Sequence, residues 1–184
     1  TTMGKLIAGL YDPSGVQIFL YGKARKPKGL QKQVLFILQE AEFQFFTNSV
    51  LHELQYGHAV TPEFEAKTEA LLKSMDLWDC RNRHPFSLSG GQMQRVAICR
   101  ALMQNPGILL ADEPVASLDP KNTQRIMDVL REISEQGISV MVNLHSVELV
   151  RAYCTRVIGV ASGQLIFDDH PSRLTQDVLQ QLYG

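Results

Sequence analysis

Hydrophobic and polar positions follow two different periods along the chain, which predicts strands that alternate with helices. Three short apolar runs have the length of strands covered on both faces, and they are residues 34–38, 107–111 and 139–144. Between the last two runs, apolar residues from Ile126 to Ile133 recur with the period of a helix. Asp119-Pro120 would begin this helix and Gly137 would end it.

The remaining segments also have readable patterns. The pattern predicts a helix over residues 1–10, a strand over 16–21 and a basic, solvated loop over 23–32. Residues 47–99 read as an all-helical lobe, in which Thr61-Pro62-Glu63 is a helix start. The last part predicts a helix over 146–153, a hairpin of 156–160 with 164–167, and a helix over 172–182.

This order of elements predicts the α/β fold class, with a parallel sheet and an inserted all-helical lobe. We expect the helical lobe to span residues 47–99. The core would be contributed by residues 1–46 and 100–184 on either side of it.

Composition narrows the classes of protein. Hydrophobic residues make up 45% of the 184 residues and charged residues 20%, which excludes a mainly disordered or collagen-like chain. Lys+Arg 18 against Asp+Glu 19 gives a net charge of -1, so no basic field predicts nucleic acid as a partner. No signal-peptide pattern and no membrane-spanning run occurs. The three cysteines have neither zinc nor disulfide spacing, which favours a reducing compartment.

A glycine pair precedes a helix-like segment at Leu88-Ser89-Gly90-Gly91-Gln92. The bare backbone amides at such a helix start, together with the Ser89 hydroxyl, suit an anion. The alternative is an ordinary Ser-capped helix after a glycine turn.

Two adjacent carboxylates, Asp112 and Glu113, follow the apolar run that ends at Ala111. In α/β proteins, sites lie at the carboxyl ends of parallel strands. One acid is suited to hold hydrated Mg²⁺ and the next to orient or deprotonate a water. The alternative is a solvated loop at the end of a strand.

Three further residues are weak signals by themselves. Asp119, in Ser117-Leu118-Asp119-Pro120, is equally well explained as a helix cap. His145 follows an apolar strand, where a histidine is more often structural, although a neutral imidazole can donate to a phosphate oxygen. Gln39 also follows a strand and is suited to ligate a metal or orient water.

The order and spacing of these motifs resemble the ATP-binding cassette (ABC) ATPases over essentially the whole chain. Leu88 to Gln92 matches the signature motif of that family, and Ile108 to Glu113 matches its Walker B strand and catalytic glutamate. Ser117 to Asp119 matches the D-loop, His145 the switch histidine and Gln39 the Q-loop. The resemblance implies a P-loop NTPase-like (RecA-like) core, ATP and Mg²⁺ as cofactors, and ATP hydrolysis.

The resemblance also implies a role for each matched residue. Asp112 would hold Mg²⁺ through water, with Thr1 and Gln39 as ligands. Glu113 would polarise the attacking water, and His145 would contact the γ-phosphate. The signature residues would face a second ABC ATPase subunit, which is identical or different, and would act in trans on its ATP. Asp119 would line the interface between the two subunits. The signature residues are Ser89, Gly90, Gly91 and Gln92.

The family's phosphate loop, G-x-x-x-x-G-K-[ST], has no match in the 184 residues. The best alignment puts Thr1-Thr2 directly after the missing Gly-Lys, where Thr1 would be the Mg²⁺-binding hydroxyl. We therefore expect an N-terminally truncated importer ATPase whose preceding strands are also missing. Such a chain would hydrolyse ATP poorly, leave sheet edges unpaired and fold marginally in isolation. Alternatives are a degenerate, non-hydrolysing cassette that lends its signature motif to an active partner, and a chimeric chain.

Different parts of the chain resemble different importers. Residues 5–57 look like energy-coupling-factor importer ATPases, whereas Ala111 to Pro120 looks more like phosphonate importer ATPases, so the cargo stays open. The resemblance implies that the helical lobe docks on a transmembrane subunit, at the inner, cytoplasmic face of the cell membrane. Phe43, Phe45 and Phe46 would lie near the hinge of that lobe, or would be plain core aromatics.

Overall fold

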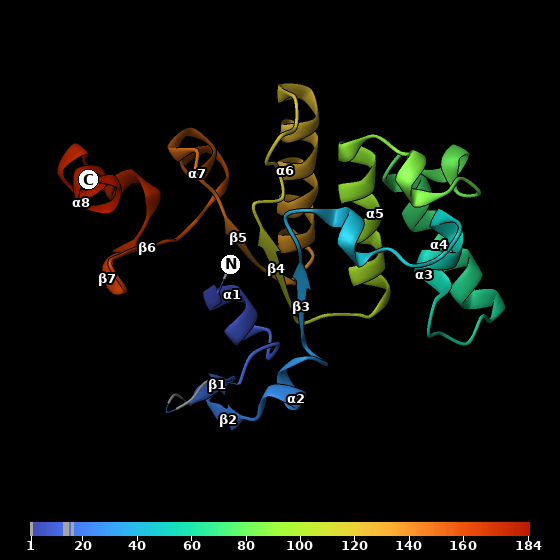
Figure 1. The fold of residues 1–184 in the computed structure, drawn as a ribbon, viewed down its shortest axis with the longest axis horizontal. Helices are drawn as coiled ribbons and strands as arrows, with labels where there is room; N and C mark the ends of the chain where they lie inside the picture. The colour runs from blue at the N-terminus through green and yellow to red at the C-terminus, as the bar shows by residue number, and fades with distance from the viewer. Residues whose placement is uncertain (1, 13–14, 16) are drawn as a thin grey trace. The chain divides into compact units, whose positions relative to one another are not determined.

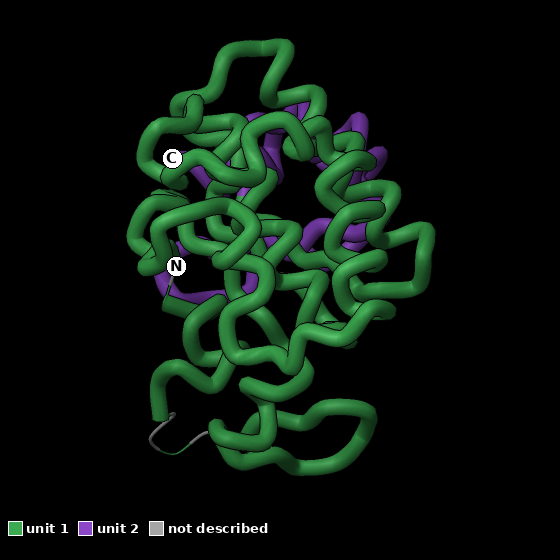
Figure 2. The backbone as a smooth tube through the Cα atoms, turned by 90° about the vertical axis from the view of Figure 1, so that its right-hand side faces the viewer, with its two compact units in different colours: residues 1–143 green, residues 144–184 purple. Residues whose placement is uncertain are grey.

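The computed structural model describes residues 2–12, 15 and 17–184, and these divide into two compact units. The first unit comprises residues 1–143 and the second residues 144–184, as Figure 2 shows.

A parallel sheet forms the centre of the first unit (Figure 1). Its strands β3 (Val34–Ile37), β4 (Ile108–Asp112) and β5 (Ser139–Asn143) lie in the order β3-β4-β5. The three apolar runs are therefore strands, as predicted. Ile37 pairs with Ala111, and Asp112 pairs with Asn143, so the carboxyl ends of all three strands reach one edge of the sheet.

Helices cover this sheet because their apolar stripes face it. In α6 (Pro120–Glu135), the stripe from Ile126 to Ile133 is buried, and the helix packs against β5 and α5. Helix α5 (Gly90–Met103) packs in turn against β3, and the short helix α1 (Thr2–Ile7) packs on β3 as well. Figure 1 shows α5 and α6 side by side.

Residues 47–99 contain helices and no strand, and the structure describes all of them. Helices α3 (Val50–Gln55) and α4 (Pro62–Ser74) pack against each other and against α5. The short 3₁₀ turns η2 (Trp78–Cys80) and η3 (Pro85–Ser87) lead into α5, whereas η1 (Ala41–Gln44) precedes the stretch. The helical character agrees with the sequence, while the domain boundaries at 46 and 99 stay predictions.

The basic stretch over residues 23–32 is not the loop that we expected. It forms strand β2 (Lys23–Arg25), which pairs antiparallel with β1 (Ile18–Leu20), and helix α2 (Pro27–Leu30). The pairing arises because Tyr21 and Gly22 both have positive φ, at 52° and 71°, and so make the tight turn of a hairpin. Pro27 then begins the helix.

The second unit consists of a hairpin and helices. Strand β6 (Val157–Ala161) pairs antiparallel with β7 (Gln164–Asp169), as predicted. Helix α7 (Val147–Tyr153) precedes the hairpin, and η4 (Pro171–Arg173) and α8 (Gln176–Tyr183) follow it. Helix α8 packs on both strands.

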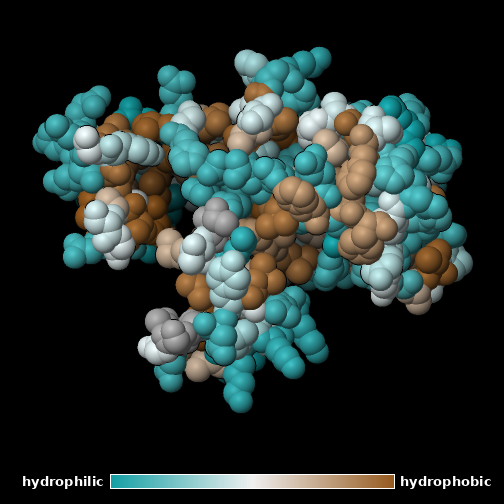
Figure 3. Space-filling model, in the orientation of Figure 1, coloured by the Kyte–Doolittle hydropathy of each residue, from teal (hydrophilic) through white to brown (hydrophobic). Residues whose placement is uncertain are grey.

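Both outer strands of the central sheet have an open edge. Among the residues that the structure describes, β3 and β5 each pair with β4 alone. Met141 on β5 is 42% exposed, and Figure 3 shows hydrophobic residues at the surface over the sheet of the first unit. The expected open edges are present, and the marginal stability that we expect from them stays a prediction.

Two further observations concern the whole described chain. No helix in residues 2–12, 15 and 17–184 is both long enough and apolar enough to cross a membrane. The three cysteines, Cys80, Cys99 and Cys154, are free thiols, and the first two are buried.

Candidate functional site

The carboxyl edge of the sheet brings three predicted site residues onto neighbouring strands. Asp112 is the last residue of β4 and Glu113 follows it, while Gln39 comes two residues after the end of β3. Since Ile37 and Ala111 are paired, Gln39 and the two acids leave the sheet at the same edge. The structure therefore places the three residues at one edge of the sheet, and their roles there stay predictions.

Asp112 is the buried member of this set, with 4% of its surface exposed. Its Oδ1 accepts a hydrogen bond of 3.0 Å from the side-chain amide of Asn143, at the end of β5. A buried carboxylate needs such donors, because an unpaired buried charge is costly. We did not single out Asn143 in the sequence, where the only signal is an amide residue at the end of an apolar strand.

Glu113 has an unusual backbone conformation. It is half-buried and has a φ of 48°, in the left-handed region that non-glycine residues rarely adopt. Ser117, four residues later, has a φ of 62°. Such conformations concentrate at functional sites, because the surrounding structure must hold them in place. The turn that Glu113 begins redirects the chain from the end of β4 toward Asp119, and Ala116 N–H donates to Glu113 O at 3.0 Å within it.

Gln39 and Asp112 fit a magnesium ion by the chemistry of their donors, since Mg²⁺ prefers oxygen ligands and keeps several waters. Within residues 2–12, 15 and 17–184, no three His, Cys, Asp or Glu side chains converge as a metal site. A magnesium ion here would therefore depend on oxygens of a bound phosphate as well as on the chain. Thr1, the other predicted ligand, lies outside the described residues, and Thr2 is exposed at the start of α1.

The glycine end of α5 has the geometry of a capped helix start. Ser89 is the N-cap, and its Oγ accepts from the backbone N–H of Gln92 at 3.3 Å. The side chain of Gln92 returns the bond by accepting from the N–H of Ser89 at 3.0 Å. The hydroxyl proton of Ser89 stays available to donate. The amides of Gly90 and Gly91 belong to the first helical turn, where α-helices offer no carbonyl partner. Both sequence readings, cap and anion site, are compatible with this arrangement.

Asp119 caps α6. Its Oδ1 accepts from the backbone N–H of Lys121 and of Asn122 at 3.0 Å each, and its Oδ2 accepts from the side-chain amide of Asn122 at 2.6 Å. These hydrogen bonds, above all that from the Asn122 side chain, lower the pKa of Asp119. The capping role that we predicted is confirmed, and a role at a subunit interface stays a prediction.

His145 belongs to the second unit, directly before Ser146, the N-cap of α7. Its side chain is exposed within the described chain. The contact with the γ-phosphate that the family resemblance implies for His145 stays a prediction.

The three phenylalanines after Gln39 have different surroundings. Phe45 is buried, whereas Phe43 and Phe46 are 73% and 57% exposed. Phe46 and Tyr56 meet edge to face, with ring centroids 4.5 Å apart. They line an open groove of about 530 Å³ on the surface of the helical lobe, which is formed by Phe46, Thr47, Asn48, His52, Gln55 and Tyr56.

Comparisons with known proteins find relatives over most or all of the chain. The family model described as ABC transporter matches residues 1–116. The phosphonates import ATP-binding protein PhnC of Rhizobium etli is 37% identical to the chain, over all of the chain and 72% of that relative. PhnC of Rhodopseudomonas palustris strain BisB5 is 48% identical, over all of the chain and 74% of that relative.

Solved structures have the same fold. CbiO1 from Clostridium perfringens, described as part of the ABC transporter complex cbiONQ, matches 94% of the chain and 73% of its own length. Its TM-score is 0.84, at 27% identity. The ATP-binding cassette MJ0796, solved as a dimer bound to ADP and Pi, matches 92% of the chain and 79% of its own length. Its TM-score is 0.77, at 30% identity.

Proposed function

Because the chain belongs to the ABC transporter family of ATPases, we propose that it is part of an importer subunit that couples ATP hydrolysis to solute uptake. The observation that carries this proposal is the edge of the sheet where Asp112 ends β4, Glu113 follows it, and Gln39 follows the end of β3. The names of the relatives favour an importer over a degenerate cassette.

Each group at the edge then has a task. Asp112 would hold a hydrated Mg²⁺ together with Gln39, and Asn143 fixes the Asp112 carboxylate through its hydrogen bond. When bound, the ion neutralises charge on the β- and γ-phosphates. Glu113 accepts a hydrogen bond from the attacking water and polarises it.

The glycine end of α5 serves a second ATPase subunit. Ser89, Gly90 and Gly91 donate to the phosphates of the ATP on that subunit, because first-turn amides and the helix dipole favour an anion. Asp119 lies at the seam between the two subunits. The composite site therefore needs two cassettes, identical or different.

A transmembrane subunit is the other partner. The groove next to α3 combines exposed aromatic rings, Phe46 and Tyr56, with the polar side chains of Asn48 and His52. Aromatic residues are enriched in protein interfaces because they bury much area with few rotatable bonds. This groove accepts a cytoplasmic segment of the transmembrane subunit, which holds the ATPase at the inner face of the membrane.

The test uses the chain joined at Thr1 to the preceding region of a phosphonate import relative, which supplies G-x-x-x-x-G-K. We refer to this as the joined chain. It is expected to release phosphate from ATP, whereas the 184-residue chain is expected to do so poorly. Glu113→Gln should slow release by about 100-fold or more, since a positioned general base contributes this much.

A matched control separates the role of Glu113 from a loss of charge. Glu132 is an exposed acid on α6, and Glu132→Gln in the joined chain should leave phosphate release unchanged. Near-normal release by the Glu113→Gln variant would overturn the assignment of Glu113.

A further inference from the structure

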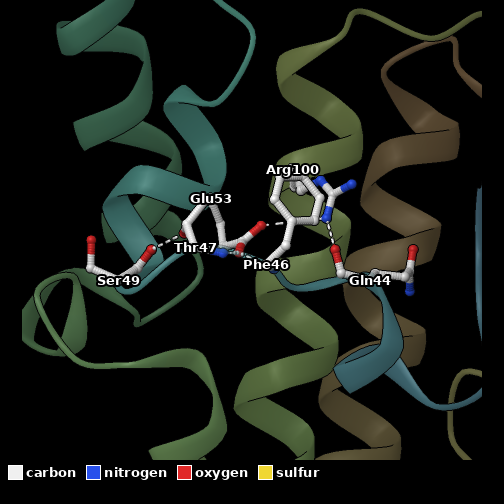
Figure 4. A network of polar contacts seen from close by, with 6 residues as sticks. All are labelled: Gln44, Phe46, Thr47, Ser49, Glu53 and Arg100. Atoms are coloured by element: carbon white, nitrogen blue, oxygen red, sulfur yellow. Dashed lines mark hydrogen bonds and ion pairs between the residues drawn. The ribbon is translucent and has the colours of Figure 1, made fainter.

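A buried carboxylate lies in the helical lobe, next to the groove that Phe46 and Thr47 line. Glu53 on α3 is 1% exposed, and its Oε1 accepts from the backbone N–H groups of Phe46 and Thr47, at 2.8 Å and 2.6 Å. Figure 4 shows the carboxylate pointing from α3 toward this stretch of chain and toward Arg100. A buried carboxylate thus holds two backbone amides of a segment that belongs to no helix or strand.

Arg100 on α5 completes the arrangement from the other side. Its Nη1 lies 3.4 Å from Glu53 Oε2, and the same nitrogen donates to the backbone carbonyl of Gln44. Its guanidinium carbon is 4.8 Å from the centre of the Phe46 ring, which is a cation–π distance. One side chain of α5 therefore contacts three parts of the network.

The start of α3 is tied to the same segment. Thr47 Oγ1 donates to the backbone carbonyl of Ser49 at 3.0 Å, and Ser49 caps α3 by accepting from the N–H of His52. The segment from Gln44 to Thr47 is thus attached to α3 through Glu53 and Ser49, and to α5 through Arg100 (Figure 4). All these residues belong to the first unit.

The position of this network along the chain gives it a consequence. The segment begins at Gln44, which is the last residue of η1 and lies five residues after Gln39, and Arg100 lies on the same helix as Gly90 and Gly91. Ten residues of helix separate Gly90 from Arg100, which is about 15 Å of rigid element. The network therefore joins the stretch after Gln39 to the helix whose other end presents the signature glycines.

We propose that Glu53 and Arg100 are positioning residues that hold Gln44–Thr47 on α5, so that this segment moves with the signature helix. The importance of Gln39 and the glycines rests on the proposed function, whereas the attachment itself concerns only this chain. The pair also helps to fix one wall of the groove, because Phe46 contacts both Arg100 and Tyr56. A partner bound in the groove would then contact Phe46 and, through Phe46 and Arg100, affect the position of α5.

Charge chemistry explains why a positioning pair suits this place better than apolar packing. Breaking a buried ion pair leaves an uncompensated charge, which is strongly unfavourable, whereas an intact pair adds little stability over apolar residues. Such a pair instead restricts the segment to one position, in which both the amides and the guanidinium are satisfied. The expected effect of a variant is therefore local.

Hydrogen–deuterium exchange of the 184-residue chain measures this directly. Glu53→Gln removes the negative charge, and its Nε2 donor must face either Arg100 or the two backbone amides, so a donor meets a donor in both orientations. We therefore expect the amides of Phe46 and Thr47 to exchange at least about tenfold faster. Amides inside α4 and α6 should keep their protection. Arg100→Ala should have the same local effect, and Arg100→Lys, which keeps a donor and a charge, should restore part of the protection.

Two controls separate positioning from general stability. Leu72→Ala replaces a fully buried side chain of α4 and leaves a cavity. It should speed amide exchange across the whole helical lobe and not at residues 46 and 47 alone. Arg131→Ala removes an exposed guanidinium from α6 and should change neither amide. If Glu53→Gln fails to fold, the comparison of Arg100→Lys with Arg100→Ala supplies the same test.

A spectroscopic readout tests the groove wall. With fluorotyrosine in place of tyrosine, the ¹⁹F resonance of Tyr56, assigned through Tyr56→Phe, should shift in Arg100→Ala and stay in place in Leu72→Ala.

The proposal is overturned if Glu53→Gln and Arg100→Ala leave the exchange rates of the Phe46 and Thr47 amides unchanged, or raise them only as much as those of all other amides. Neither measurement depends on ATP turnover, so both would still test the attachment of this segment if the proposed function were wrong.

Discussion

Gly91 and Asn122 lie so close together that no side chain fits between them. A Cβ atom on Gly91 would come within 2.6 Å of Asn122 Oδ1 and 2.7 Å of its Cγ. Asn122 is itself fixed, because its side-chain amide donates to Asp119. The signature glycine and the loop that ends at Asp119 therefore support each other within one chain.

The first prediction concerns this contact. Gly91→Ala should lower the free energy of unfolding by about 1–3 kcal/mol, the usual cost of overpacking, because Asn122 must leave Asp119 to make room. Urea unfolding of the 184-residue chain measures the change. Gly90→Ala is the matched control, since a Cβ there meets only Leu118 Cδ2 at 3.4 Å, an ordinary contact.

A double variant shows whether Asn122 is the cause. In an Asn122→Ala background the nearest atoms are gone, so Gly91→Ala should cost clearly less than in the natural chain. An equal cost in both backgrounds would mean that the helix start itself, and not the contact, excludes a side chain at this position.

The second prediction concerns acid stability. Hydrogen bonds from Asn122 and Lys121 lower the pKa of Asp119 below its ordinary value of 3.8. The folded state therefore binds this proton less readily than the unfolded state, so the carboxylate stabilises the fold above the ordinary pKa. This stability is lost as the pH falls through the lower, folded-state value.

Removing the carboxylate should weaken this dependence. Asp119→Asn should make urea unfolding less sensitive to pH between about pH 4 and pH 2, where the natural chain loses the contribution. Glu132→Gln, at an exposed position of α6, is the control for the loss of one negative charge. A decrease in pH sensitivity no larger than that of the control would contradict the capping account.

The third prediction concerns Cys99. Burial in α5 raises the pKa of its thiol to about 12, so the reactive thiolate is nearly absent in the folded chain at neutral pH. The raised pKa also means that the contribution of this thiol to the free energy of unfolding is complete below the ordinary pKa of 9.0, and that it falls as the pH rises toward 12.

At pH near 8, a thiol reagent should label Cys99 far more slowly than the partly exposed Cys154, until urea unfolds the chain. Mass spectrometry of the labelled peptides checks this, and equal labelling rates without urea would be the contrary result.

The fourth prediction concerns Asn143. Its hydrogen bond to the buried Asp112 carboxylate is a bond to a charged group, and such bonds contribute about 1.5–3 kcal/mol. Asn143→Ala should lower the free energy of unfolding by about this amount. Asn48→Ala, which affects an exposed bond to His52, should cost much less. Similar costs for the two variants would argue against a special role for Asn143.

Much of this arrangement could be predicted from the sequence, because the relevant signals are local. The strand ending at Asp112, the helix that begins after Asp119 and the cap at Ser89 follow from periodicity and capping residues near each position. The edge shared by Gln39 and Asp112 follows from the parallel order of strands, which their alternation with helices requires.

The residues that sequence reasoning missed act through distant partners. Asn143 meets Asp112 across 31 positions, and Glu53 meets Arg100 across 47. No local pattern marks either pair, because a buried charge is recognised only when its surroundings are known. The basic stretch after Tyr21 was misread for a different reason, since its charged composition concealed the hairpin turn at Tyr21-Gly22.

The account depends most on Glu113 acting in hydrolysis and not in nucleotide binding. The most direct measurement is the identity of the nucleotide retained by the joined chain after incubation with ATP and Mg²⁺. We predict that the natural sequence retains mainly ADP, whereas Glu113→Gln binds nucleotide equally well and retains ATP. Equal proportions of ADP in both proteins, at equal occupancy, would contradict the account.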